Sequence, residues 1–454
     1  MRLLKKITDK KILYIFTLCI LVFIPILKQL SFYLVKFNVI NNHDSINPAI
    51  VLYFTIPFLL YIYIKNLIKT KRKLDIYDYL FYILIFVGII ATLFSINKEI
   101  SLFGKEYRHE GFLTMISYYF LFITWKIEGN KEDIKKLINI FTLIAVINVV
   151  YAIFQIYTPF KFILRYGLDK QMASGISGNP NFFGSLIVTV LSIITSKCLI
   201  DKKLSIKQIL LIILLYISLI NAQSTGPFLT YIITILFLII YLFIKKKIII
   251  KNMICLISIL VITYPSLIYI NKEIFNINRC EICDFTNSVL KDETPNELPN
   301  NTNINNVTID NYTISNGRVD IWKNSLNIVK DNLITGVGYD NFYLGYYGDV
   351  NFNEVSFVSI EGEIKAYRKY SQIVDNAHNV YLNTLVSTGL LGLIPYLLLC
   401  LLTFIKCLRT NDNLIIILLG GFVAYSVQAF ANISVVQVAP IYYVIIGLIL
   451  SIKQ

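Results

Sequence analysis

The sequence predicts an all-α polytopic membrane protein with about 12 transmembrane helices and one large extracytoplasmic loop that carries short helices. Two observations predict this fold class. Hydrophobic residues make up 56% of the 454 residues and charged residues 15%, with a mean hydropathy of +0.65, whereas a soluble domain carries about 25% charged residues. Apolar segments of roughly 20 residues also recur along the chain, each long enough to cross about 30 Å of hydrocarbon.

The predicted spans divide the chain into three parts. Residues 1–270 form a membrane domain of nine helices, residues 271–377 form the extracytoplasmic loop, and residues 378–454 hold three more spans. The apolar segments are 12–36, 46–65, 77–96, 110–127, 136–157, 180–200, 204–222, 227–244, 248–270, 379–405, 413–431 and 434–452.

The distribution of basic residues predicts the orientation of the chain in the cell membrane. With the N-terminus in the cytoplasm, the predicted inner segments hold 25 of the 42 Lys and Arg residues. This positive-inside pattern places both termini in the cytoplasm and the large loop outside. The loop carries 9 basic and 15 acidic residues. The net charge of +14 is therefore a topology signal, and we expect no nucleic-acid partner.

The N-terminal segment and the cysteines also bear on the class of protein. Basic residues precede the first apolar segment, as in a secretory signal, but that segment is long and no small-residue cleavage site follows it, which predicts an uncleaved anchor. Five cysteines lie in or beside spans, whereas Cys280 and Cys283 lie in the outer loop with the spacing of a local disulfide. A zinc site would need two further ligands, so we expect no metal and no cofactor.

The large loop has two unlike halves. Residues 284–316 are rich in Asn, Thr, Asp and Glu and have almost no apolar clusters, which is typical of a disordered segment. From Arg318 onwards, apolar residues recur at helical spacing, which predicts an amphipathic helix over 318–331 at the outer membrane face. The residues of its apolar face are Val319, Trp322, Leu326 and Val329.

Two residues at the ends of the last part of this loop have chemistry suited to group transfer. Arg318 offers a planar fork of donors for phosphate oxygens, and His378 can take up a proton near pH 7. Two plainer readings compete: a histidine at a helix start is often a cap, and Arg318 could pair with Asp320 or a lipid phosphate. No Asp or Glu lies in the central part of any predicted span, so the spans lack the ionisable relay of an ion-coupled transporter.

Several motifs in chain order resemble the O-antigen ligase and polymerase superfamily, whose fold is of the membrane glycosyltransferase C type. The motifs are Gly178-Asn179-Pro180-Asn181, Gly317-Arg318-x-x-x-Trp322, Gly336-x-Gly338, Ala377-His378-Asn379-x-Tyr381-Leu382 and Gly389-x-x-Gly392. The number of helices and the position of the loop agree with that family. The resemblance implies a metal-independent glycosyltransferase that moves a glycan from undecaprenyl pyrophosphate to a glycan or lipid-linked acceptor.

The resemblance also implies roles for residues. His378 is the base that activates the acceptor hydroxyl, and Arg318 holds the pyrophosphate. Many members have Ser-Arg-Gly where this chain has Ser224-Thr225-Gly226, so we expect Arg108 or Arg165 to supply the second phosphate-binding arginine. Further candidate substrate-binding residues are His109, Asn379 and Tyr381, although Tyr381 also suits an interfacial packing role.

Two other function classes stay open at this point. A transporter or flippase with the loop as a lid would need a continuous polar path through the spans, and the sequence shows none. A non-catalytic partner in a cell-surface polysaccharide assembly complex would tolerate replacement of His378. Ligase and polymerase share their chemistry and differ only in acceptor, so the sequence does not separate them.

Overall fold

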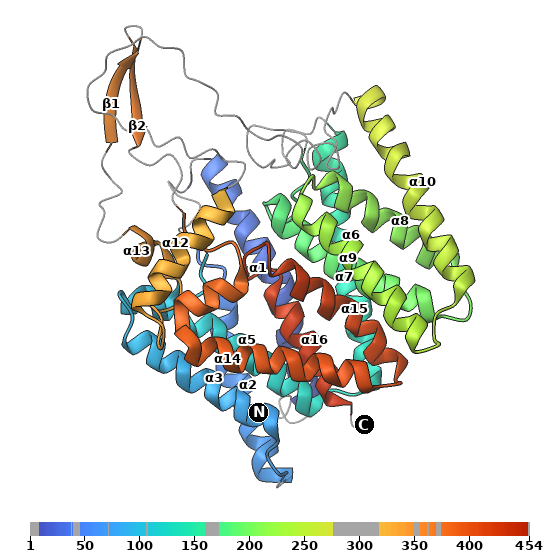
Figure 1. The fold of residues 1–454 in the computed structure, drawn as a ribbon, viewed down its shortest axis with the longest axis horizontal. Helices are drawn as coiled ribbons and strands as arrows, with labels where there is room; N and C mark the ends of the chain where they lie inside the picture. The colour runs from blue at the N-terminus through green and yellow to red at the C-terminus, as the bar shows by residue number, and fades with distance from the viewer. Residues whose placement is uncertain are drawn as a thin grey trace.

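Helices form the membrane part of the protein (Figure 1). The computed structural model describes residues 9–37, 39, 46–70, 72–105, 108–158, 172–275, 317–347, 355–360, 363–368 and 374–452. Arg165, the pair Cys280 and Cys283, and the segment 284–316 lie outside the described residues. Each predicted span corresponds to one helix. These helices are α1 (Asp9–Lys36), α2 (Ile50–Thr70), α3 (Ile76–Leu93), α5 (Phe112–Glu128), α6 (Lys131–Tyr157), α7 (Pro180–Ile200), α8 (Ile206–Asn221), α9 (Thr225–Ile244), α10 (Ile250–Phe275), α14 (Val380–Arg409), α15 (Asn413–Gln428) and α16 (Ala439–Ser451).

Length separates these helices into two groups. Within the described parts of the chain, eight are long and apolar enough to cross a membrane, namely α1, α2, α3, α6, α7, α9, α10 and α14. The helices α8, α15 and α16 are apolar but shorter, and α5 has 17 residues. The most apolar 18-residue stretch of α7 is 94% buried and that of α10 only 11%, so α7 lies inside the bundle and α10 at its edge (Figure 1). The protein is therefore a multi-pass membrane protein, while the number of 12 spans stays a prediction.

Charged residues at helix ends on the predicted inner side are joined in ion pairs. Asp75 caps α3 in a capping box, and its carboxylate contacts Lys126 at 2.6 Å. Lys126 also lies 3.0 Å from Asp78, which pairs with Arg72 as well. These contacts join the start of α3 to the end of α5. Because the partners share one ion-pair network, Lys126 has a structural role besides the topology signal.

The predicted orientation can be tested with single cysteines placed in a cysteine-free variant. We expect Asn300→Cys to react with a membrane-impermeant maleimide added outside intact cells, because the large loop is predicted to lie there. Leu204→Cys, between α7 and α8, should react only after the membrane is opened. Labelling of position 204 but not of position 300 from outside would reverse the orientation.

The large loop adds elements above the bundle. They are α12 (Gly317–Asp331), α13 (Phe342–Tyr347) and the antiparallel strands β1 (Val355–Ile360) and β2 (Glu363–Arg368), which pair from Val355 opposite Arg368 to Ile360 opposite Glu363. The hairpin projects from the helices (Figure 1) and was not expected from the sequence. A further short helix, α4 (Lys98–Phe103), lies in the loop between α3 and α5.

The buried face of α12 differs from the predicted one. Ile328 and Val329 are buried, whereas Val319 and Leu326 are 52% and 50% exposed. The buried side chains form a small core with Val337, Phe342, Ala377 and Val386. α12 therefore packs on the loop and on the start of α14 through Ile328 and Val329, and the contact of its predicted apolar face with the membrane stays a prediction.

A break in α14 fixes the loop to the bundle. Gly389 has φ 62° and ψ −164°, and a Cβ atom there would lie 2.1 Å from the carbonyl oxygen of Ile334, so only glycine fits. The loop forms main-chain hydrogen bonds on both sides of this break. They are Val337 N–H to Val386 O and Gly338 N–H to Ser387 O, each 2.9 Å, Leu390 N–H to Leu333 O at 2.8 Å and Leu391 N–H to Ile334 O at 3.3 Å.

Candidate functional site

One short loop between α4 and α5 presents Arg108. The loop is closed at its base by two glycines, because a Cβ atom on Gly111 would lie 2.2 Å from the main-chain nitrogen of Gly104. Gly104 also has φ +87°, which a larger residue rarely adopts. Inside this base, the N–H groups of Arg108 and His109 donate to the carbonyl of Lys105 at 3.2 and 2.9 Å. The main chain therefore holds Arg108 in a tight turn.

Arg108 forms a two-point ion pair with Asp375 in the large loop. Its Nε lies 2.6 Å from Oδ2 and its Nη2 lies 3.0 Å from Oδ1, and the two side chains are 10% and 21% exposed. Burial raises the pKa of Asp375, but the charge and hydrogen bonds of Arg108 outweigh it and hold this pKa below its usual value. Asp375 is therefore ionised at neutral pH and orients the guanidinium.

His378 sits in a strained conformation directly before α14. Its φ is 50°, in the left-handed region, and its N–H donates to Asn376 Oδ1 at 3.1 Å. On one side of it, Trp322 Nε1 donates to the carbonyl of Ala377 at 2.9 Å. On the other side, Asn379 caps α14 by accepting from the N–H of Leu382 at 3.0 Å. Residues held in such backbone regions cluster at functional sites.

The charges around His378 favour its neutral form. Burial lowers the pKa of His378, the Asp375 carboxylate raises it, and the Arg108 and Arg318 charges lower it, so the pKa lies below its ordinary value of 6.5. We call Arg108, Arg318, Asp375 and His378 the Arg–His cluster. At pH 7 the imidazole in this cluster is free to accept a proton.

Three other candidate residues, Arg318, His109 and Tyr381, differ in burial and in contacts. Arg318 is exposed in the first turn of α12. His109 is buried with φ 57°, and its carbonyl accepts from the Thr114 hydroxyl at 2.6 Å. The Tyr381 hydroxyl donates to the carbonyl of Ser426 at 2.8 Å, and its ring packs 4.6 Å from that of Phe430. These contacts with Ser426 and Phe430 support the packing role of Tyr381.

Arg108 is linked through the start of α7 to the turn that lacks the expected arginine. Its guanidinium is 5.9 Å from the centre of the Phe182 ring, and the neighbouring Asn181 accepts a hydrogen bond from Ser224, next to Thr225. Asn179 caps α7 and Pro180 occupies its first turn. A cavity of about 20 Å³ is lined there by Lys28, Pro48, Arg108, Phe182 and Val435 to Gln437. Arg108 thus connects the Asn179–Asn181 motif with the Arg–His cluster.

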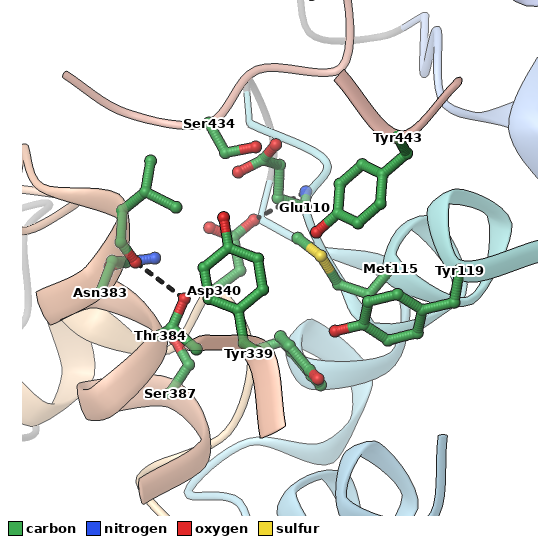
Figure 2. A pocket seen from close by; sticks show the side chains of 12 residues that line it. Glu110, Met115, Tyr119, Tyr339, Asp340, Asn383, Thr384, Ser387, Ser434 and Tyr443 are labelled. Atoms are coloured by element: carbon green, nitrogen blue, oxygen red, sulfur yellow. Dashed lines mark hydrogen bonds between the residues drawn. The ribbon is translucent and has the colours of Figure 1, made fainter. Parts of the chain in front are cut away.

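A second cavity, of about 40 Å³, lies beside α5 and α14 (Figure 2). It holds two buried carboxylates, Glu110 and Asp340. Burial raises the pKa of Glu110 to about 8, with a hydrogen bond from Ser434 opposing it, and raises that of Asp340 to about 6, with N–H groups of Lys105 and Glu110 opposing it. The cavity residues are Glu110, Met115, Tyr119, Tyr339, Asp340, Val380, Asn383, Thr384, Ser387, Tyr396, Ser434 and Tyr443.

Neither of these two cavities is lined by His378 or Arg318, so neither one joins the three residues Arg108, Arg318 and His378. Sequence reasoning also assigned no role to Asp375, Asp340 or Glu110. Each lies inside or beside a motif: Asp375 three residues before His378, Asp340 after Gly336-x-Gly338, and Glu110 two after Arg108. These positions beside the motifs were the only sequence signal for the three carboxylates, and they do not say which residue each carboxylate contacts.

The fold and the cluster define a helical multi-pass membrane protein that carries buried and paired charges on its loops. Residues 209–397 match the model of the family described as O-Antigen ligase, which confirms the resemblance found in the sequence. The matched segment runs from α8 into α14 and includes Arg318, Asp340, Asp375 and His378, whereas Arg108 and Glu110 lie outside it. No curated protein matches the chain.

Proposed function

We propose that the protein transfers or polymerises an undecaprenyl-pyrophosphate-linked glycan at the outer face of the cytoplasmic membrane. The observation that carries this proposal is the Arg–His cluster. Two arginines, an orienting carboxylate and a histidine of lowered pKa come together from the α4–α5 loop, α12 and the start of α14. The match to the O-Antigen ligase family supports the type of activity.

The proposed reaction forms one bond and breaks one. His378 takes the proton from the acceptor hydroxyl, and the acceptor oxygen attacks the anomeric carbon of the donor glycan. The bond between that carbon and the pyrophosphate oxygen breaks, and undecaprenyl pyrophosphate leaves with the bonding electrons. Arg108 and Arg318 stabilise the charge on the departing pyrophosphate, which arginine can do without a metal ion.

Asp375 prepares Arg108 for this task. The bidentate contact fixes the plane of the guanidinium before a donor arrives, which reduces the ordering required on binding. The negative charge of Asp375 also raises the pKa of His378 and thus opposes the two arginines. Asp375 therefore keeps the imidazole basic enough to accept a proton beside two cations.

The proposed orientation puts this cluster outside the cell. In this orientation all 12 helices cross the membrane and both termini are cytoplasmic. Residues 104–111 and 317–378 then lie at the outer face. The donor lipid would then reach the cluster from the outer leaflet. The acceptor is a glycan or a lipid-linked molecule, and its identity separates ligase from polymerase.

The direct test uses the purified protein in lipid nanodiscs with an undecaprenyl-pyrophosphate-linked glycan extracted from the source cells. If the protein is a ligase, we expect release of undecaprenyl pyrophosphate only when a separate acceptor is added. If it is a polymerase, the donor alone should release undecaprenyl pyrophosphate and give a lengthened glycan, because a second donor molecule is then the acceptor. Transfer should continue in the presence of EDTA. Absence of any product, together with unchanged surface polysaccharide in a deletion strain, would reject the proposal.

A further inference from the structure

We propose that Asp340 is a positioning residue that holds Arg108 in place through the main chain of the α4–α5 loop. This inference depends on the proposed function, in which Arg108 binds pyrophosphate. Asp340 Oδ2 accepts from the N–H of Lys105 at 2.7 Å. It also accepts from the N–H of Glu110 at 3.2 Å (Figure 2). These residues lie just inside the glycines that close the loop. One oxygen atom therefore holds both sides of the turn that carries Arg108.

Asp340 can act as an anchor because its own turn is fixed. The N–H of Tyr339 donates to Ser101 Oγ at 3.1 Å, and Asn341 Nδ2 donates to the carbonyl of Asn97 at 3.0 Å. The rings of Tyr339 and Phe112 are stacked with their centres 5.9 Å apart. The hydrogen bonds of Val337 and Gly338 join the same turn to α14. The anchor is thus attached to α4, α5 and α14 together.

The same contacts relate Arg108 to His378. Arg108 points to Asp375, which precedes His378 by three residues, and His378 precedes α14 directly. Asp340 fixes the loop of Arg108 to the turn that hydrogen-bonds α14. The pyrophosphate-binding arginine and the base are therefore both held by the start of α14 and the turn that is hydrogen-bonded to it. Loss of the anchor would free the arginine and leave the base in position.

Three variants separate this role from a general structural one. Asp340→Ala removes the accepting oxygen. Asp340→Gly removes it too but suits the φ of 56° at this position, so it excludes backbone strain as the cause of an effect. Asp340→Asn keeps one carbonyl oxygen and also tolerates this φ, so it can accept from both N–H groups. Because it removes a buried charge, Asp340→Asn should melt no lower than the wild type at pH 7.5.

The first measurement is steady-state transfer by the full-length protein in nanodiscs. We expect Asp340→Ala and Asp340→Gly to raise the KM for the lipid-linked donor by about tenfold, with a smaller change in kcat, because they displace a substrate-binding group. Asp340→Asn should restore a KM close to that of the wild type. Adding Asp340→Gly to Arg108→Ala should cause no further rise in KM, since Asp340 acts through Arg108.

The second measurement needs no activity. Hydrogen exchange should show faster exchange at the amides of Lys105 and Glu110 in Asp340→Gly but not in Asp340→Asn. Equal exchange in wild type and Asp340→Gly, or a full additional KM effect in the Arg108→Ala background, would overturn the inference. An Asp340→Asn protein as impaired as Asp340→Gly would also overturn it. If His378→Ala were fully active, the proposed function would fail while the exchange result stood.

Discussion

Replacing His378 by alanine should lower the rate of glycan transfer by about 10²- to 10⁴-fold, the usual contribution of a general base. The protein should remain in the membrane and bind the donor as before, because Arg108 and Arg318 are untouched. His378→Asn is the matched variant, since asparagine adopts the φ of 50° at this position but cannot accept a proton near pH 7. Product formation from lipid-linked glycan in nanodiscs measures the rate.

The pH dependence of the wild type gives a second readout of the same residue. Because burial and the two arginines lower the pKa of His378, the neutral base persists below pH 6.5, and activity should fall only at lower pH. Arg318→Ala removes a charge that lowers this pKa, so the fall in transfer rate at acid pH, which we call the acid limb of the pH profile, should move to higher pH. Asp375→Asn removes a charge that raises it, so the limb should move to lower pH. Shifts of opposite sign would contradict the assignment of His378 as the base.

The second large effect is expected at the arginines. Arg318→Lys should reduce transfer by about tenfold or more, because lysine keeps the charge but loses the bidentate fork for phosphate oxygens. Arg108→Ala should raise the donor KM, and the added change Thr225→Arg should restore part of the loss, since Arg108 is linked through the start of α7 to the turn of residues 224–226. Donor binding and steady-state transfer measure both.

Lys330→Ala serves as the control for these changes. Lys330 lies at the other end of α12 from Arg318 and donates to Asn327 Oδ1 at 3.2 Å on an exposed surface. Its removal changes the net charge of the loops on this side of the protein by the same amount as Arg108→Ala. We expect wild-type kinetics. A similar loss in Lys330→Ala would mean that the overall loop charge, not the pyrophosphate contact, governs donor use.

The helical framework followed from the sequence because apolar length is a strong local signal. Every predicted span coincides with a helix. The face of α12 was harder to predict, because its burial depends on a turn and a helix start that come later in the chain. Ile328 lies outside the predicted apolar repeat, yet these later residues bury it.

In the candidate site, too, local sequence predicted some residues and only tertiary contacts identified the others. Arg108, Arg318 and His378 could be proposed from residue chemistry and motif position. Their carboxylate partners could not, because the large loop holds 15 acidic residues and spacing alone does not distinguish Asp375 or Asp340 from the others. Arg108 and Asp375 are 267 residues apart, and Lys105 and Asp340 are 235 apart. Only the folded chain brings these pairs together.

The break at Gly389 has a consequence for how α14 enters the lipid bilayer. In an unbroken helix, the N–H groups of Leu390 and Leu391 would donate to the carbonyls of Val386 and Ser387. In the folded protein the same four groups bond instead to residues 333, 334, 337 and 338 of the loop. These four groups of α14 are therefore paired in both arrangements, and glycine permits both. The translocation machinery can therefore insert α14 as a straight segment with no unpaired amide facing lipid, and the docking loop introduces the bend afterwards.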